Sequence, residues 1–283
     1  MTAGPDPRLH PWREDLAAAG LRGQVDAPRY AQGRARHVAA ASAPLRRRPR
    51  ADAPLETEAL RGEAVTVYDE QEGWAWVQLG YDGYVGYMPA AALAEGAGNP
   101  THRVTALRTY VFPTPDIKAP PADLLSLNAL VEAAGTIGRF LKLSTGGYIA
   151  EGHAAPAAQY AGDFVAVAER FIGTPYLWGG RTSLGLDCSA LVQLSLQAAG
   201  VASPRDTDMQ EAALGNPVEV GPALAGLRRG DLVFWKGHVG IMTASDTLLH
   251  ANAFHMETAR EPLCEAAGRI SAGGAAITSV RRL

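Results

Sequence analysis

The 283-residue sequence contains only two cysteines, Cys188 and Cys264. Two thiols do not make the disulfide framework of a small secreted domain, so stability must come from packed cores. Hydrophobic residues make up 47% of the chain and charged residues only 19%, which supplies such cores and excludes a disordered chain. The length predicts two or three domains.

An excess of charge of either sign is also absent, because the formal net charge is only -3. This balance excludes a general attraction to nucleic acid or to an anionic membrane, so neither is expected as a partner. One basic run covers residues 46–50, and we expect it to be a solvated loop or an edge strand.

Long hydrophobic runs are missing as well. No stretch approaches the length that spans a membrane, and residues 1–20 lack the continuous apolar segment of a secretory signal. We therefore expect a cytoplasmic protein. The sequence also lacks a GxSxG elbow, a Walker loop, a CxxC pair and an HExxH motif, which removes the common signatures of serine hydrolases, nucleotide-binding proteins and zinc sites.

The composition changes along the chain and predicts four parts. Residues 1–35 form an arm with a short helix at 15–20, ended by Gly20. Residues 36–96 hold short β-branched and aromatic runs separated by turn pairs such as Glu72-Gly73, which predicts a small β-barrel. A fainter copy of this pattern occupies residues 100–155, and residues 158–283 form the last domain.

The last domain is predicted to be α+β, because a helical half precedes a half made of antiparallel strands. Residues 163–172 and the segment after Cys188 have helical patterns, the second apolar enough to be buried and followed by Gly200. Strands are expected at 230–235, 238–242, 247–253 and 276–280.

Cys188 begins the predicted buried helix. A cysteine in the first helical turn lies near unpaired backbone N–H groups and the positive end of the helix dipole, and both favour the thiolate. We therefore predict that Cys188 is a nucleophile. Cys264 has no histidine near it in the sequence and is expected to be structural.

A nucleophilic cysteine needs a base, and His238 and His250 are the candidates. The midpoint between them falls in residues 243–246, a good turn sequence. A hairpin centred there places the two imidazoles opposite each other or one position out of register, within reach of direct contact. Taken alone, Cys188 has an alternative role as an inert buried thiol, and each histidine has one as a structural residue. A zinc site formed by Cys188, His238 and His250 is a further alternative that no close ligand pair supports.

Five motifs in a fixed order carry a resemblance to a known family. They comprise residues 175–180, residues 187–192, residues 230–234, residues 237–241 and His250. This order resembles the NlpC-type (NlpC/p-sixty) cell-wall cysteine peptidases. The resemblance implies a papain-like fold with Cys188 as nucleophile, His238 as base and His250 orienting that base. It also implies that Tyr176 lies at the oxyanion position, with helix packing as the alternative.

The two upstream barrels resemble bacterial SH3-like domains, and the whole architecture is similar to γ-D-glutamyl-L-diamino acid endopeptidases that trim murein peptides. That subgroup holds a free N-terminal L-Ala beside the nucleophile. By motif, the resemblance implies this role for Asp187, Ser189 and Asp206, and a tyrosine of the first barrel completes the pocket. Tyr84 is the first choice for that tyrosine and Tyr81 the second, with core packing as the alternative. The neighbouring motif residues Trp178 and Arg205 are further candidates for substrate contact.

The predicted function is thus a cytoplasmic cysteine peptidase that needs no metal or cofactor and acts in cell-wall peptide recycling. It cleaves L-Ala-γ-D-Glu from a following diamino acid, either meso-diaminopimelate or L-Lys. Two alternatives stay open: an endopeptidase or amidase of intact peptidoglycan, and a non-catalytic protein that binds wall peptides. For Asp187 the alternative role is that of a helix N-cap, and for Asp206 that of a solvated loop residue.

Overall fold

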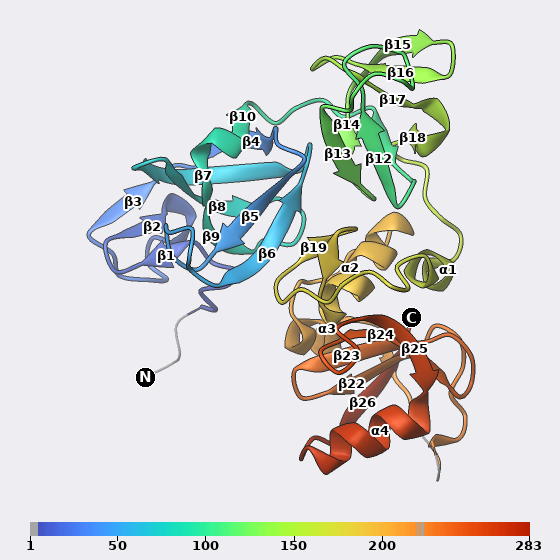
Figure 1. Ribbon diagram of the computed structural model, residues 1–283. Coiled ribbons are helices and arrows are strands. Elements are labelled where there is room, and N and C mark those ends of the chain that lie inside the picture. The colour runs from blue at the N-terminus through green and yellow to red at the C-terminus, as the bar shows by residue number, and fades with distance from the viewer. Residues whose placement is uncertain (1–4, 220, 222–223) are drawn as a thin grey trace. The chain divides into compact units, whose positions relative to one another are not determined.

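The computed structural model describes residues 5–219, 221 and 224–283, so the first four residues of the predicted arm lie outside the described part. The chain divides into two compact units, residues 1–158 and residues 159–283, coloured from blue to green and from yellow to red in Figure 1. Unit 1 is built of strands, and unit 2 mixes helices with strands. Among the described residues, no helix combines the length and the apolarity that crossing a bilayer requires.

Unit 1 begins with a small sheet where a helix was predicted. Residues Leu16–Ala18 form a buried strand, β2, followed by one 3-10 turn, η1, at Ala19–Leu21. β2 pairs with β1 (Trp12–Arg13) and, in parallel, with β3 (Arg29–Ala31). The helix prediction for residues 15–20 is therefore wrong. A six-residue helix is marginal in water, and the backbone pairing of a buried strand outweighs the helix propensity of its alanines.

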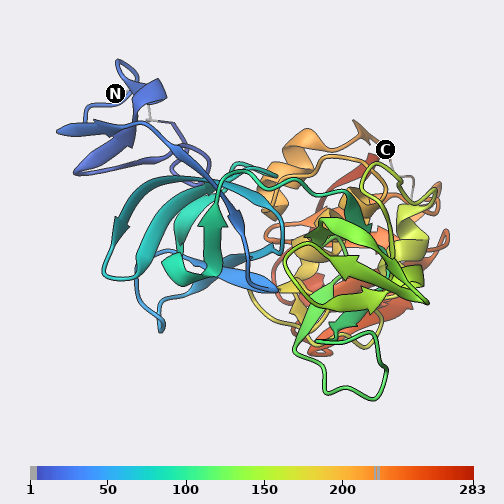
Figure 2. The ribbon, with the colours of Figure 1, turned by 90° about the horizontal axis from the view of Figure 1, so that it is seen from above.

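The next part of unit 1 is a seven-stranded sheet in the order β10-β4-β7-β8-β9-β5-β6, beside which the blue β1–β3 sheet projects in Figure 2. The predicted turn at Glu72-Gly73 is confirmed, since both residues have positive φ (50° and 80°) and Gln71 pairs with Trp74. The strands are β4 (Arg34–Val38), β5 (Ser42–Arg46), β6 (Leu55–Leu60), β7 (Ala64–Gln71), β8 (Trp74–Leu79), β9 (Val85–Pro89) and β10 (Leu93–Glu95), with the 3-10 turn η2 at Ala90–Ala92.

The remainder of unit 1 forms three small antiparallel sheets around a separate apolar core. Val104, Leu125, Leu141 and Ile149 are among the buried side chains of that core. The sheets are β14-β11-β18, β12-β13 and β15-β16-β17. Their strands are β11 (His102–Val104), β12 (Arg108–Val111), β13 (Asp123–Ser126), β14 (Leu130–Val131), β15 (Ala133–Ile137), β16 (Phe140–Leu143), β17 (Tyr148–Ala150) and β18 (Ala154–Pro156), with η3 at Glu151–His153.

Unit 2 is a six-stranded antiparallel sheet, in the order β21-β26-β22-β23-β24-β25, with helices packed against it. Strand β25 and helix α4 were not predicted from the sequence. The helices are α1 (Phe164–Glu169), α2 (Cys188–Ala198), α3 (Thr207–Ala213) and α4 (Leu263–Ala272). The strands are β19 (Arg181–Thr182), β20 (Gly185–Leu186), β21 (Asn216–Pro217), β22 (Leu232–Trp235), β23 (His238–Met242), β24 (Thr247–Asn252), β25 (Glu257–Pro262) and β26 (Ile277–Arg282).

Helix α2 is the central helix of unit 2, and all eleven of its residues are buried. It packs against β23 and β24 and ends before Gly200, whose φ of 78° suits a glycine after a helix. Its two glutamines bond the buried Arg181 of β19: Nε donates to Gln193 Oε1 (2.6 Å) and Nη2 to Gln197 Oε1 (3.0 Å). The prediction of a buried helix that starts at Cys188 is confirmed.

Candidate active site

Cys188 is the first residue of α2, and Asp187 is its N-cap. The thiol is buried, with the Thr207 hydroxyl 4.0 Å from Sγ. The backbone N–H of Val239 also bonds the thiol, which places Cys188 beside the start of β23, next to His238. The helix start and the histidine strand therefore meet at the predicted nucleophile.

Asp187 takes the N-cap role that was the alternative to substrate binding. Its Oδ1 accepts from the N–H of Ala190 (2.9 Å), and Oδ2 accepts from the N–H of Gly179 (3.0 Å). The Arg205 guanidinium donates to both oxygens, at 2.9 Å and 2.7 Å, and Ser189 Oγ donates to Oδ1 at 3.2 Å. These five donors fill the roughly four acceptor positions of a carboxylate, which leaves none for a substrate ammonium.

Arg205 and Ser189 belong to the same buried network. Arg205 is 1% exposed and donates to Ser189 Oγ at 2.8 Å as well as to Asp187. The prediction that Arg205 contacts substrate is therefore corrected: its guanidinium neutralises the N-cap carboxylate below the nucleophile. Ser189 is buried too, with its hydroxyl between these two charged groups. The network fixes the start of α2.

His238 and His250 come together across a hairpin, as the spacing predicts. Ile241 pairs with Leu249 and Met242 with Leu248, so this register sets Gly240 opposite His250 and makes His238 its diagonal neighbour. His238 Nε2 lies 2.8 Å from His250 Nδ1, and the ring centroids are 5.0 Å apart. The histidine pair is thus one hydrogen-bonded unit on one face of the sheet.

The pair continues into a carboxylate that sequence reasoning missed. His250 Nε2 lies 2.7 Å from Glu261 Oε1, and Arg269 donates to Oε1 at 2.6 Å and to Oε2 at 2.8 Å. The guanidinium holds the pKa of Glu261 at about 2, so this carboxylate accepts hydrogen bonds only. His250 Nε2 must then donate to Glu261, and its Nδ1 accepts from His238 Nε2–H. Nδ1 of His238 is then the unprotonated nitrogen of that ring, which can accept a proton.

The site holds its thiol and imidazole uncharged. Burial, followed by the charge of Asp187, raises the pKa of the Cys188 thiol to about 11, and burial followed by His250 lowers the pKa of His238 to about 3. Burial therefore opposes the thiolate that the helix start favours. Taking the thiolate out of water costs more than the ~0.3–1 kcal/mol that a helix dipole supplies. Formation of a thiolate here therefore requires a nearby group that accepts the proton, and the neutral imidazole of His238 is such a group.

The structure also describes the other predicted site residues of unit 2. Tyr176 lies close enough to Cys188 for their charges to interact, and burial raises the pKa of its hydroxyl to about 12, which keeps it a hydrogen-bond donor. Asp206 is half-buried and precedes Thr207, the residue that contacts the thiol; its side chain makes no cap bond to α3. Trp178 is exposed in the loop before α2.

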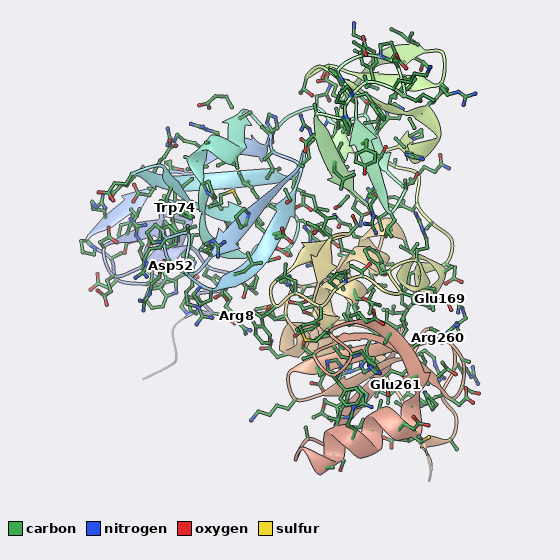
Figure 3. The ribbon with its side chains drawn as sticks, viewed as in Figure 1. Arg8, Asp52, Trp74, Glu169, Arg260 and Glu261 are labelled. Atoms are coloured by element: carbon green, nitrogen blue, oxygen red, sulfur yellow. The ribbon has the colours of Figure 1, made fainter. Side chains whose placement is uncertain are left out.

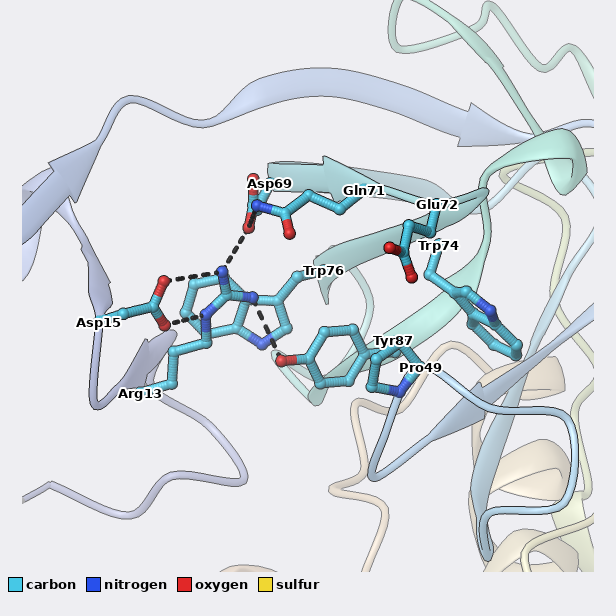
Figure 4. Close-up of a pocket in the computed structure, with 9 residues that line it drawn as sticks. All are labelled: Arg13, Asp15, Pro49, Asp69, Gln71, Glu72, Trp74, Trp76 and Tyr87. Carbon is cyan, nitrogen blue, oxygen red and sulfur yellow. Dashed lines mark hydrogen bonds and ion pairs between the residues drawn. The ribbon is translucent and has the colours of Figure 1, made fainter.

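Tyr84 of unit 1 is 3% exposed, which agrees with the core-packing alternative. It lines a cavity of about 430 Å³ together with Trp76 and Tyr87. A neighbouring cavity of about 310 Å³ is drawn in Figure 4. Arg13 lines this cavity and donates hydrogen bonds to Asp15, Asp69 and Tyr87 Oη. Its guanidinium lies 4.6 Å from the centre of the Trp76 ring. Sequence reasoning found neither cavity, because their walls join the first sheet of unit 1 to the second.

A possible metal-binding group differs from the zinc alternative considered above. In the described part of the chain, ligand atoms of His250, His255 and Glu261 lie within 4.8 Å of one another. The Arg269 guanidinium occupies both carboxylate oxygens of Glu261, so a cation there would meet a fixed positive charge. The donor set therefore fits a hydrogen-bond network better than a metal.

Comparison with known proteins agrees with these elements. Residues 173–265 match the NlpC/P60 family, and residues 45–93 match the family described as the bacterial dipeptidyl-peptidase Sh3 domain. The chain is an NlpC/P60 family protein. Its NlpC/P60 domain therefore covers α2, the histidine hairpin and β25, and its SH3 domain lies within unit 1.

Several relatives of this NlpC/P60 protein match most of its length. The "Gamma-D-glutamyl-L-lysine dipeptidyl-peptidase" of Bacillus subtilis is 29% identical over 222 residues, which is 71% of this chain and 73% of the relative. The "Dipeptidyl-peptidase 6" of Lysinibacillus sphaericus is 27% identical over 241 residues, 76% of this chain and 86% of the relative. The crystal structure of an NlpC/P60 family protein from Bacillus cereus shares the fold, with a TM-score of 0.72 at 21% identity over 88% of this chain and 99% of that one.

The buried histidines of the NlpC/P60 domain predict acid sensitivity. His238 has a pKa of about 3 when folded against 6.5 for an ordinary histidine, so the unfolded chain binds a proton first as the pH falls. The free energy of unfolding should therefore drop from about pH 6.5 towards pH 3, by up to about 1.4 kcal/mol per pH unit for this one group. Urea unfolding at several pH values measures the slope, which should be shallower in His238→Asn. Equal slopes in the two proteins would contradict the assignment.

Proposed function

We propose that this protein is a cysteine peptidase that cleaves the γ-D-glutamyl–diamino acid bond of murein peptides with a free N-terminal L-Ala. The observation that carries the proposal is the buried thiol of Cys188 beside the strand that bears the His238–His250 pair. The names of the relatives from Bacillus subtilis and Lysinibacillus sphaericus support the substrate class. The diamino acid is meso-diaminopimelate or L-Lys.

The reaction begins with proton transfer from the Cys188 thiol to Nδ1 of His238, which leaves a thiolate and an imidazolium. The thiolate attacks the γ-carbonyl carbon, and the oxyanion accepts from the Cys188 N–H and the Tyr176 hydroxyl. The imidazolium then gives its proton to the leaving amine, and the C–N bond breaks to yield a thioester. His238 next takes a proton from water, and the hydroxide attacks the thioester carbonyl. The C–S bond breaks, L-Ala-D-Glu leaves, and the imidazolium returns its proton to the Cys188 sulfur.

Recognition of the free amine is assigned to Asp206. Asp206 is half-buried and directly precedes Thr207, whose hydroxyl lies 4.0 Å from the thiol, so its carboxylate is placed close to the nucleophile along the chain. A carboxylate that binds an ammonium in a closed site rejects an N-blocked peptide, because its charge is then left unpaired. Trp178 stays a candidate for a remaining wall of the pocket.

A requirement for the free amine places the enzyme after release of the peptide from the glycan. We therefore include in the proposal a cytoplasmic role in wall-peptide recycling. We also propose that residues 100–155 are a second SH3-like barrel. Their own apolar core around Leu125 and Ile149 supports this part of the proposal.

Mass spectrometry of the products from free and N-acetylated L-Ala-γ-D-Glu-diaminopimelate, and from the L-Lys peptides, tests this function. We expect L-Ala-D-Glu and the free diamino acid from the free peptide, and a rate at least about 100-fold lower from the acetylated one. In Asp206→Asn, an isosteric change, the preference for the free amine should shrink to a few-fold.

Three outcomes would contradict the proposal. Equal cleavage of both peptides would favour an endopeptidase of intact peptidoglycan, and release of acetate from the N-acetylated peptide would favour an amidase. No turnover of any peptide would favour a non-catalytic binder of wall peptides. Glu169→Gln serves as the control for Asp206→Asn, because Glu169 is an acidic side chain in surface ion pairs with Arg229 and Arg260.

A further inference from the structure

Three side chains form a diagonal row across adjacent strands of the NlpC/P60 domain. On β24, His250 pairs with Ala259 of β25, so Glu261 is its diagonal neighbour on one side, as His238 is on the other. Hydrogen bonds of 2.8 Å and 2.7 Å join the row from His238 to His250 and from His250 to Glu261. Figure 3 labels Glu261 beside α4. The sheet itself thus aligns the carboxylate with the base.

The far end of the row is anchored from α4. Arg269 donates to both oxygens of Glu261, and its guanidinium lies 4.1 Å from the centre of the Phe254 ring. Glu261 is 9% exposed and His250 is 0% exposed, so the contact between them is shielded from water. An ion pair alone would need only Arg269; here Oε1 of Glu261 also accepts from the imidazole. The carboxylate therefore has a second task besides the ion pair.

We propose that Glu261 and Arg269 are positioning residues of the active site, which fix the ring and tautomer of His250 and thereby the proton acceptor of His238. This proposal rests on the proposed peptidase chemistry and deepens it. The proton of the Cys188 thiol goes to His238 Nδ1 and no further, and Glu261 stays ionised throughout. Its negative charge stabilises the imidazolium that forms, while Arg269 limits that stabilisation.

The charged groups that face the row shift the equilibrium between the neutral thiol–imidazole pair and the thiolate–imidazolium pair. Glu261 raises the pKa of both histidines, Arg269 lowers it, and His255 lies 3.9 Å from Glu261 Oε1. At the other end of the row, Asp187 and Arg205 act on the thiol with opposite signs. Loss of Glu261 should therefore disfavour the thiolate–imidazolium pair, and loss of Arg269 should favour it.

The test measures alkylation of Cys188 by iodoacetamide against pH, in a Cys264→Ser background that removes the exposed second thiol. We expect Glu261→Gln to lower the rate at pH 7 by about 10- to 100-fold and to move the onset of reactivity to higher pH. Glu261→Asp should restore part of the rate. Arg269→Met, which replaces a partly exposed side chain, should move the onset to lower pH.

A matched control comes from a second buried carboxylate with a two-point arginine partner. Arg282 donates to Asp231 at 2.7 Å and 2.6 Å in the same sheet. Asp231→Asn should lower stability and leave the pH profile of the folded protein unchanged. An unchanged profile in Glu261→Gln, or shifts of one sign in Glu261→Gln and Arg269→Met, would overturn the proposal.

The outcomes separate this inference from the proposed function, because alkylation uses no peptide substrate. If His238→Asn leaves the rate and the pH profile of Cys188 alkylation unchanged, the cysteine peptidase chemistry itself fails. If Cys188 reacts but Glu261→Gln leaves its profile unchanged, only the role of Glu261 fails. Should Glu261→Gln not fold, Glu261→Asp and Arg269→Met carry the test through their opposite expected shifts.

Discussion

Replacing Cys188 by alanine is expected to lower hydrolysis of L-Ala-γ-D-Glu-diaminopimelate by a factor on the order of 10⁴ to 10⁶. Alanine removes the sulfur that forms the thioester, whereas the oxyanion donors and the peptide pocket stay in place. Only the weak catalysis that these groups provide for direct attack by water remains. The measurement is kcat/KM from product formation, followed by mass spectrometry.

The matched control for this experiment is Cys264→Ser. Cys264 is exposed on α4 and its thiol is not part of the diagonal row, so its replacement should leave kcat/KM within a factor of about two. Circular dichroism of Cys188→Ala should match the wild type, because the change removes one buried sulfur at a helix start. If Cys188→Ala keeps more than a few per cent of the wild-type activity, Cys188 is not the nucleophile.

Replacing Arg205 by methionine is expected to destabilise unit 2 by about 3–5 kcal/mol. The change leaves the Asp187 carboxylate buried without the two guanidinium bonds of 2.9 Å and 2.7 Å that now neutralise it. Methionine fills similar space, so the loss reports the unpaired charge rather than a cavity. Calorimetric unfolding of the full chain measures it, with the transition of unit 2 moving to lower temperature.

The control is Arg229→Met, since Arg229 pairs with Asp163 and Glu169 but its side chain is 39% exposed. Such a surface pair should contribute no more than about 1 kcal/mol. Adding Asp187→Asn to Arg205→Met should recover part of the loss, because a neutral amide still caps the helix at Ala190. If Arg205→Met lowers the free energy of unfolding no more than Arg229→Met does, the buried-charge argument is contradicted.

Local patterns predicted the parts of the site that lie close together in the sequence. The glycine at residue 200 and the apolar run before it indicated the Cys188 helix, and the turn at residues 243–246 indicated the histidine hairpin. Both features depend on backbone conformation, which neighbouring residues largely determine. The hairpin is centred one residue beyond the midpoint between the two histidines. Their rings therefore meet diagonally rather than directly opposite each other, and they still make contact.

Features that depend on distant partners could not be predicted. Glu261 lies on β25, which was not recognised as a strand because it has three charged residues, a proline and no large apolar side chain. The role of Asp187 depended on Arg205, eighteen positions further along the chain. The state of the Cys188 thiol depended on burial, which overrides the helix dipole and which no local pattern reports. A helix predicted at residues 15–20 became a strand for the same reason, through pairing with β1 and β3.

A helix that is buried on every side, as α2 is, has no polar face to set its rotation about its own axis. Polar contacts must therefore fix that rotation, and α2 has two sets of them. Asp187 bonds Arg205 at the start of the helix, and Arg181 bonds the two glutamines further along. A rotation of about 25° would move the Cα of Cys188 by about 1 Å, since helical Cα atoms lie about 2.3 Å from the axis. A displacement of that size can reduce a rate by about 100-fold. The two buried arginines therefore fix the position of the Cys188 thiol through their contacts with α2, and this role needs no contact with a substrate.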